Sequence, residues 1–270
     1  MSHDLLAFVG GGNMAAAIIG GLRAAGRPAD TILVIDPEQA QRAKLAAEHG
    51  VRTQAVADAA LARAAVVVWA VKPQLFGEAA APCAAHVRGA LQFSVMAGIR
   101  SDAIVRATGS QRVVRSMPNT PALIGQGIAG LYARDAVSAD ERHTAEALLA
   151  PTGRTLWVER EEDLDAVTAL SGSGPAYVFY FVEAMMQAAQ EMGLSAEQGR
   201  QLALATFAGA AALAQASSEP PEVLRERVTS KGGTTYAALT SMDASGVKTA
   251  LVKAIRAAQQ RARELGDQFG

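Results

Sequence analysis

The chain has 270 residues, half of them apolar, and a formal net charge of −1, so it can bury a large core in one or two domains. Lys and Arg are spread along it, which argues against a nucleic-acid partner, and its apolar runs are shorter than the roughly 18 residues of a membrane helix. Cys83 is the single cysteine, so we expect neither a disulfide nor a metal site. The first 22 residues contain no Lys or Arg and resemble no signal peptide, so we expect a soluble, cytoplasmic protein.

A dinucleotide-binding fingerprint opens the chain. Leu5 to Val9 forms a predicted buried strand and is followed at once by Gly10-x-Gly12-x-x-Ala15. Residues 14–25, rich in helix formers, form the next predicted element. Gly10 would allow a tight turn, Gly12 would let the backbone approach a pyrophosphate, and Ala15 would let the helix pack closely on its strand. A plain α/β packing turn is the alternative interpretation.

The second predicted strand, Thr31 to Ile35, ends at an acidic residue. Asp36 lies 21 positions after Ala15, close to the spacing of about 20 at which an acid accepts a hydrogen bond from the ribose 2′-OH. Its charge should repel a 2′-phosphate, which favours NAD(H). Arg42, on the following helix, could offset that charge.

Strands and helices alternate up to about residue 160, which predicts a doubly wound parallel sheet. Further strands are predicted at Val66–Val71, Leu91–Ala97 and Val113–Met117, and two edge strands at Ile128–Ala133 and Thr155–Val158. Helices are predicted from Pro37, in a first turn, to His49, from Ser101 to Gly109, and from Ser138 to Leu149, the last with a Ser138-x-x-Glu141 capping box.

After about Glu162 the strand signals disappear and helices follow. They are predicted at Pro175–Met192, from a Ser195 cap to Ala216, and at Val247–Leu265. Several are apolar on more than one face, which predicts a homodimer because such helices must be buried on every side. The predicted fold class is therefore α/β, with a Rossmann-like doubly wound sheet over residues 1–161 and an all-helical dimerisation and substrate-binding domain over 162–270.

Residues that follow the strands are the first candidates for a cofactor site, because the carboxyl ends of parallel strands face the ligand crevice. Lys72-Pro73, Ala97-Gly98 and Met117-Pro118-Asn119 lie at or directly after the ends of three successive predicted strands. They form a plausible floor for ribose and nicotinamide. The alternative interpretation is a solvated surface lysine for Lys72 and an ordinary turn for Ala97-Gly98.

Two Gly-rich stretches in the helical half combine hydroxyl residues with bare backbone: Ser171-Gly-Ser-Gly-Pro-Ala-Tyr177 and Thr229-Ser-Lys-Gly-Gly-Thr-Thr-Tyr236. Each is predicted to start a helix and so to offer an anion site, although a capped helix start is the simpler alternative. For the second stretch an anion site is favoured, because Lys-Gly-Gly-Thr-Thr exposes more N–H groups than a cap requires.

The chain offers no obvious general acid. Its histidines lie away from the predicted strand ends, and the first Gly-rich stretch contains no lysine. A reaction that needs little proton transfer from the protein fits better: hydride delivery to an already protonated C=N bond, with a hydroxyl that only holds the nitrogen.

At these motifs the chain resembles the pyrroline-5-carboxylate reductases, the enzymes of the last step of proline synthesis. The resemblance covers Gly10-Gly-Gly-Asn-Met-Ala15, Val71-Lys72-Pro73, Ala97-Gly98, Arg115-Ser-Met-Pro-Asn-Thr-Pro121, Ser171–Tyr177 and Thr229–Leu239 with Met242-Asp243. It implies an active site at a dimer interface, dimers often assembled into decamers, and NADP(H) as preferred cofactor with NAD(H) also accepted.

The resemblance also implies residue roles. Ser230 and the backbone of Gly233, Thr234 and Thr235 would hold the substrate carboxylate, the Thr235 hydroxyl would face the ring nitrogen, and Glu219 is a second candidate near that nitrogen. The expected cofactor-binding residues are Gly10, Gly12, Asn13, Met14, Asp36, Ala70, Lys72, Pro73, Ala97, Gly98 and Asn119. The alternatives are a related imine or β-hydroxyacid reductase, which should carry a catalytic Lys or Asp in the first Gly-rich stretch, and a dinucleotide-binding protein without turnover.

Overall fold

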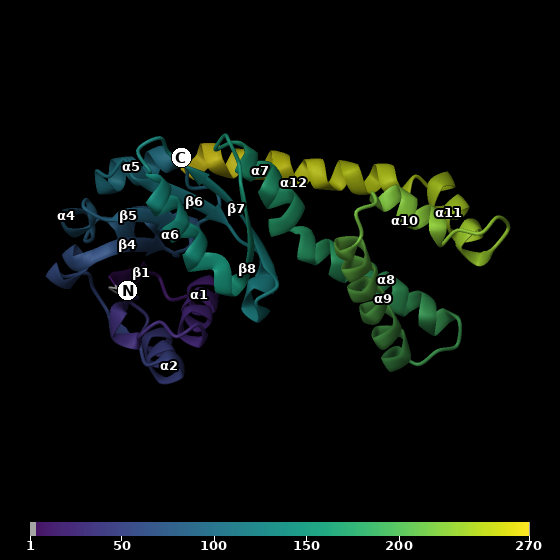
Figure 1. Ribbon diagram of the computed structural model, residues 1–270, viewed down its shortest axis with the longest axis horizontal. Coiled ribbons are helices and arrows are strands. Elements are labelled where there is room, and N and C mark those ends of the chain that lie inside the picture. The colour runs from purple at the N-terminus through teal and green to yellow at the C-terminus, as the bar shows by residue number, and fades with distance from the viewer. Residues whose placement is uncertain (1–3, 270) are drawn as a thin grey trace. The chain divides into compact units, whose positions relative to one another are not determined.

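The structure is a computed structural model that describes residues 4–269 (Figure 1). Its contacts divide the chain into two compact units. The first comprises the chain up to Ser173 together with its end from Ala258, and the second comprises Gly174–Ala257. Each unit is described by itself.

The first unit is built on an eight-stranded sheet with the order β3-β2-β1-β4-β5-β6-β7-β8. The strands are β1 Leu5–Val9, β2 Ile32–Ile35, β3 Arg52–Gln54, β4 Ala64–Trp69, β5 Leu91–Ser94, β6 Val113–Met117, β7 Gly127–Ala133 and β8 Gly153–Trp157. Neighbouring strands are parallel except β6 and β7, which are antiparallel. Chain order reverses between β1 and β4, and such a switch point is where doubly wound sheets bind their ligands.

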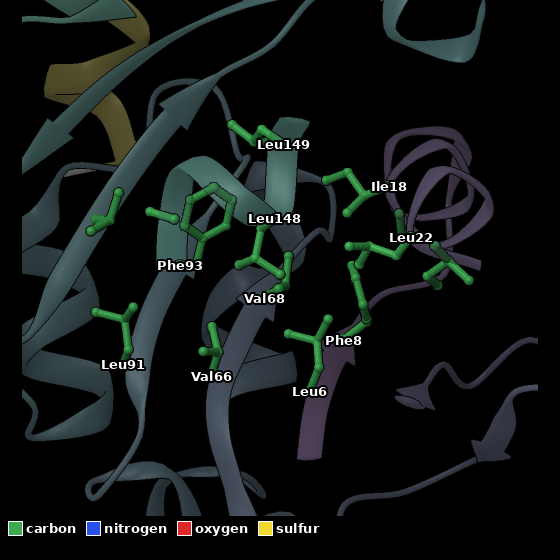
Figure 2. Packing of buried hydrophobic residues seen from close by; sticks show 14 of the residues in the cluster. Leu6, Phe8, Ile18, Leu22, Val66, Val68, Leu91, Phe93, Leu148 and Leu149 are labelled. Atoms are coloured by element: carbon green, nitrogen blue, oxygen red, sulfur yellow. The ribbon is translucent and has the colours of Figure 1, made fainter. Parts of the chain in front are cut away.

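Helices cover both faces of this sheet. They are α1 Asn13–Ala24, α2 Gln39–His49, α3 Phe76–Ala80, α4 Ala84–Val87, α5 Ser101–Thr108, α6 Ala139–Leu149 and α7 Asp163–Val167. One core forms where α1, α2 and α6 pack on one face; Figure 2 shows Phe8, Val68 and Phe93 of the strands in this core with Ile18 of α1 and Leu148 of α6. A second core, with α3, α4 and α5, lies on the other face. Successive strand residues alternate between the two cores, and β1, β2 and β4 are accordingly apolar throughout.

The second unit is entirely helical. It contains α8 Gly174–Glu191, α9 Ala196–Ala216, α10 Pro221–Arg227, α11 Thr234–Ala244 and the first part of α12 Val247–Phe269. Helices α8 and α9 lie side by side (Figure 1), and a Cβ on Gly199 would come within 2.9 Å of the Ala189 Cβ, so their backbones approach closely. Among residues 4–269, no helix has the length and apolarity to span a membrane.

The structure confirms the Rossmann-like sheet, the helical second half and the α6 and α9 capping boxes at Ser138 and Ser195. Two sequence-based expectations were wrong in detail, and one strand was not predicted. Helix α2 begins at Gln39, two residues after Pro37, because the Asp36 carboxylate accepts from the Glu38 N–H and holds a turn there. Strand β7 is internal, between β6 and β8. The short polar strand β3 was missed.

The first Gly-rich stretch also differs from expectation, because it is not simply the start of a helix. Thr168–Gly172 forms a π-helical segment between α7 and α8, and α8 begins at Gly174. A Cβ on Gly172 would come within 2.6 Å of the Met117 Cε, so a glycine lets this segment lie against the end of β6. Such π segments are frequent at functional sites.

Candidate functional site

The turn after β1 lies directly against the end of β4. The Gly10 N–H donates to the Ile35 carbonyl at 2.8 Å, and Gly10 has a φ of +94°. A Cβ on Gly10 would stand 2.6 Å from the Ala70 carbonyl oxygen. Both the left-handed backbone and the close approach therefore require glycine at this position.

The amino end of α1 is open. Gly12 is the N-cap residue with an extended backbone, and no side chain caps the helix. A Cβ on Gly12 would meet nothing within 4 Å, and Asn13, the first helical residue, is exposed. The first N–H groups of α1, including those of Asn13 and Met14, thus face accessible space with the positive end of the helix dipole, which fits a pyrophosphate.

Asp36 is bound to the fingerprint loop. Its Oδ2 accepts from the Gly11 N–H at 2.7 Å, and its Oδ1 accepts from the Glu38 N–H at 2.8 Å. The Gln41 amide donates to the Gly11 carbonyl. Sequence reasoning missed Gly11 and Gln41; the three-glycine run was the one available signal for the former. The loop that carries the fingerprint glycines is therefore fixed from the β2–α2 connection.

Arg42 lies beside Asp36 but does not contact its carboxylate. Its Nη1 donates to the backbone carbonyls of Asp36 at 2.7 Å and Pro37 at 2.8 Å. The guanidinium thus stands at the residue that would face the adenosine ribose. A positive charge there reduces the repulsion that Asp36 exerts on a 2′-phosphate.

The remaining cofactor candidates follow β4 and β5 at the same edge of the sheet. The Ala70 N–H still bonds to the Val9 carbonyl at 2.8 Å, which keeps Ala70 beside the fingerprint turn. Lys72 is exposed, next to the short 3-10 turn Pro73–Leu75. Ala97 and Gly98, the latter with a φ of +75°, lie in the loop between β5 and α5. The structure brings all of these residues to the carboxyl edge of neighbouring strands.

Asn119 is engaged within the protein. Its Oδ1 accepts from the Ile128 N–H at 3.0 Å, and its Nδ2 donates to the Ser171 carbonyl at 3.2 Å. The side chain therefore joins β7 to the π-helical segment. In this arrangement Asn119 shapes the floor of the edge after β6.

The turn before α11 presents a second open helix start. Gly232 has a φ of +75°, and Gly233 is an N-cap residue without a side-chain cap. The Gly233 N–H donates to the Ser230 carbonyl at 3.0 Å. The amides of Thr234 and Thr235 are therefore the first of the uncapped N–H groups at the start of α11. A Cβ on Gly233 would lie 2.5 Å from the Ser230 Oγ, so that hydroxyl stands over the same turn. This arrangement suits a carboxylate.

Glu219 lies in the same unit, immediately before the Pro220–Pro221 pair. Its carboxylate accepts from the Arg227 guanidinium, and its N–H donates to the Ser217 Oγ at 3.0 Å. The ion pair joins the segment before α10 to Arg227, the last residue of that helix. Glu219 therefore has a structural partner within its own unit.

Two family models match the chain. Residues 161–265 match the model described as pyrroline-5-carboxylate reductase dimerisation, and residues 5–98 match NADP oxidoreductase coenzyme F420-dependent. The pyrroline-5-carboxylate reductase of Pseudomonas aeruginosa is 46% identical over 100% of both chains. The chain belongs to the pyrroline-5-carboxylate reductase family. It is an oxidoreductase with a dinucleotide-binding domain and an oligomerisation domain.

Solved structures of pyrroline-5-carboxylate reductases have the same fold over the full length. That from Coxiella burnetii is 34% identical, with a TM-score of 0.91, and covers 98% of this chain and 99% of its own. That from Plasmodium falciparum, described with NADP bound, is 26% identical, with a TM-score of 0.86, and covers 98% of this chain and 99% of its own. The open starts of α1 and α11 therefore belong to a pyrroline-5-carboxylate reductase fold.

Proposed function

We propose that this member of the pyrroline-5-carboxylate reductase family reduces 1-pyrroline-5-carboxylate to L-proline with NAD(P)H, the last step of proline synthesis. The observation that carries the proposal is the full-length similarity to the curated reductase, together with an uncapped α11 start that fits a carboxylate. The first Gly-rich stretch holds serines instead of a catalytic Lys or Asp, which argues against a β-hydroxyacid reductase.

The cofactor is assigned to the carboxyl edge of the sheet. Gly12, Asn13 and Met14 hold the pyrophosphate with backbone N–H groups, and Gly10 forms the tight turn that places them. The other assigned residues are Asp36 at the adenosine ribose and Ala70, Lys72, Pro73, Ala97, Gly98 and Asn119 toward the nicotinamide. When bound, NADPH supplies the hydride. We propose NADP(H) as the preferred cofactor, with NAD(H) also accepted, because Arg42 offsets the charge of Asp36.

The substrate carboxylate is assigned to the turn before α11. The Ser230 hydroxyl and the amides of Thr234 and Thr235 hold the anion, while Gly233 permits the close turn. The Thr235 hydroxyl donates a hydrogen bond to the ring nitrogen. The nitrogen arrives protonated, and the C=N π electrons become its lone pair as the hydride adds to the carbon, so the hydrogen bond donated by Thr235 forms toward the transition state. Glu219 is a secondary candidate for the same end of the ring.

The helical domain, residues 162–270, is proposed as the dimerisation and substrate-binding domain, and the assembly as a homodimer that can build decamers. Large apolar side chains of α8 and α9 are exposed in the isolated chain, including Phe179, Tyr180 and Leu213. Burial in a partner copy would remove them from water. We place the enzyme in the cytoplasm, in keeping with its single cysteine.

The test is the oxidation of NADPH, followed by absorbance, after the cyclic imine is added to the purified full chain. Turnover with L-proline as product is expected, with lower efficiency for NADH. No turnover with either cofactor, while NADPH still binds, would favour a dinucleotide-binding protein. If other imines or β-hydroxyacids are turned over more efficiently than 1-pyrroline-5-carboxylate, the chain is better described as a related imine or β-hydroxyacid reductase.

A further inference from the structure

The loop between β5 and α5, residues 95–100, is held on one side by the end of α12. A Cβ on Gly98 would lie 3.3 Å from the Leu265 Cβ, and a Cβ on Gly266 would lie 2.5 Å from the Arg100 guanidinium. Met96 and Ile99 of the same loop are buried. Ala97 and Gly98, between these two residues, are half-buried.

The helix that follows this loop is capped by a distant residue. Arg100 is the N-cap residue of α5 and gives no side-chain cap. Instead, the Glu161 Oε1 accepts from the Ser101 N–H at 2.6 Å, and the Glu161 Oε2 accepts from the Ser101 Oγ at 2.6 Å. A carboxylate at this end of a helix satisfies an orphan donor and interacts favourably with the helix dipole. The cap comes from a residue 60 positions away in sequence.

Glu161 is itself fixed by a buried arginine. The Arg115 Nη1 donates to Glu161 at 2.7 Å, and the exposed fractions of the two side chains are 6% and 15%. Burial lowers the pKa of Arg115, whereas the Glu161 charge opposes that shift. Arg134 donates to the Ser101 Oγ at 2.9 Å, so the Ser101 hydroxyl both donates and accepts. Both carboxylate oxygens of Glu161 are therefore engaged, Oε1 by Ser101 and Arg115 and Oε2 by Ser101.

A second ion pair holds the preceding residue of the loop. The Arg100 Nη2 lies 2.8 Å from the Asp165 Oδ2 of α7. Residues 100 and 101 are thus each bound to a carboxylate from the segment 161–165. That segment fixes the point at which the loop becomes helix.

We propose that Glu161 is a positioning residue for cofactor binding, which acts through Ser101 to fix the backbone of Ala97 and Gly98 at the start of α5. The proposal rests on the proposed function, in which these two residues line the nicotinamide side. A loop fixed before binding loses less conformational entropy when the cofactor binds, so loss of the cap should weaken cofactor affinity.

Ser101→Ala is the primary test, because it removes the hydroxyl bond to Glu161 and leaves the Ser101 N–H bond and the Glu161–Arg115 pair in place. The dissociation constant of NADPH, by fluorescence titration, and the KM for NADPH should rise about three- to tenfold, with the KM for the imine unchanged. Glu161→Gln should raise the same constants, although the loss of the partner of buried Arg115 threatens folding. In the double variant the rise in the NADPH dissociation constant should be smaller than the product of the two single rises. Both substitutions affect the same contact, the hydrogen bond between the Ser101 hydroxyl and Glu161.

Two controls separate positioning from stability. Ser138→Ala removes a helix cap of the same chemistry at α6, and Glu162→Gln neutralises the exposed neighbour of Glu161. Neither should change the NADPH constants. If Ser101→Ala lowers the melting temperature as Ser138→Ala does and leaves NADPH affinity at the wild-type value, the positioning role is overturned.

Gly98→Ala distinguishes failure of this proposal from failure of the proposed function. It should weaken NADPH binding, because a φ of +75° and the nearby Leu265 both disfavour a side chain. If Gly98→Ala weakens NADPH binding and Ser101→Ala does not, the positioning role of Glu161 is wrong. The assignment of Gly98 to the cofactor site is then retained. If neither variant changes NADPH affinity, the loop does not contact the cofactor. Both the positioning role of Glu161 and the assignment of this loop to the cofactor site are then wrong.

Discussion

The Thr235 hydroxyl lies on the second residue of α11, beside the turn assigned to the substrate carboxylate. Thr235→Val keeps the shape and removes the hydroxyl. A neutral hydrogen bond is worth about 0.5–1.5 kcal/mol and a charged one about 1.5–3 kcal/mol, so kcat should fall roughly tenfold to a hundredfold. Steady-state kinetics with the cyclic imine measure this.

Thr240→Val is the matched control for that variant. Its hydroxyl lies on the same helix and bonds the Tyr236 carbonyl at 2.8 Å, so kcat should stay near the wild-type value. A Thr235→Val enzyme with unchanged kcat and a raised KM would make the hydroxyl a binding group. The role at the nitrogen would then pass to Glu219 or to water.

Ser230 should behave differently from Thr235. The substrate carboxylate carries the same charge before and after hydride transfer, so its hydrogen bond to Ser230 contributes equally to the ground state and the transition state. Ser230→Ala should therefore raise the KM for the imine several-fold, about tenfold at most, with little change in kcat. A large fall in kcat with unchanged KM would contradict this assignment.

Asp36 combines a charge near the ribose with two hydrogen bonds to its own loop. Asp36→Ser should lower kcat/KM for NADH, because both the ribose acceptor and the support of Gly11 are lost. For NADPH the loss of repulsion opposes the loss of support, so the ratio of the two kcat/KM values should shift toward NADPH.

Asp30→Ser is the control for charge alone, because exposed Asp30 lies before β2, at the opposite end of that strand. Kinetics with both cofactors measure the ratio. An equal loss for NADH and NADPH in Asp36→Ser would mean that Asp36 only supports the loop. If the ratio and both kcat/KM values are unchanged, Asp36 neither contacts the ribose nor supports the loop.

At the scale of elements, the α6 capping box gives a clean stability prediction. Ser138 accepts from the Glu141 N–H, and the Glu141 carboxylate accepts from the Ser138 N–H. Ser138→Ala should cost about 1 kcal/mol and lower the melting temperature by about 2–4 °C. Thr144→Ala, an exposed change on the same helix, should stay within about 0.5 kcal/mol of wild type. Equal melting temperatures for the two variants would show that the cap contributes nothing.

At the scale of the whole molecule, the exposed apolar surface of the helical unit predicts an oligomer. Phe179 is 58% exposed and Leu213 is 60% exposed. Glutamate at either position would place a charge in the interface, so Phe179→Glu and Leu213→Glu should shift sedimentation toward smaller species with reduced activity. Val56→Glu, at a 65% exposed site in the sheet unit, should leave the assembly unchanged. A stable, active wild-type monomer would contradict the predicted dimer.

Local sequence determined much of the sheet unit and its cofactor edge. Buried strands such as β1 and β4 are continuous apolar runs, and glycines and capping boxes mark where the next elements start. The positions of Gly10 and Gly12 follow from this pattern, because they lie within one strand–turn–helix unit, and Asp36 follows from its place directly after the next apolar strand. Strand β3 was not predicted, because its three residues at the sheet edge are all polar and show no alternation of apolar and polar side chains.

Only the tertiary structure decided which distant groups meet. The bond from Asp36 to Gly11, the bridge from Asn119 to Ser171 and the Glu161 cap on Ser101 join residues that are 25, 52 and 60 positions apart. No local pattern encodes such a contact, because spacing along a chain fixes neighbours within one helix or strand but not across a sheet. Sequence therefore determined the elements and the residue types at their ends, and packing of the sheet determined how those ends are held.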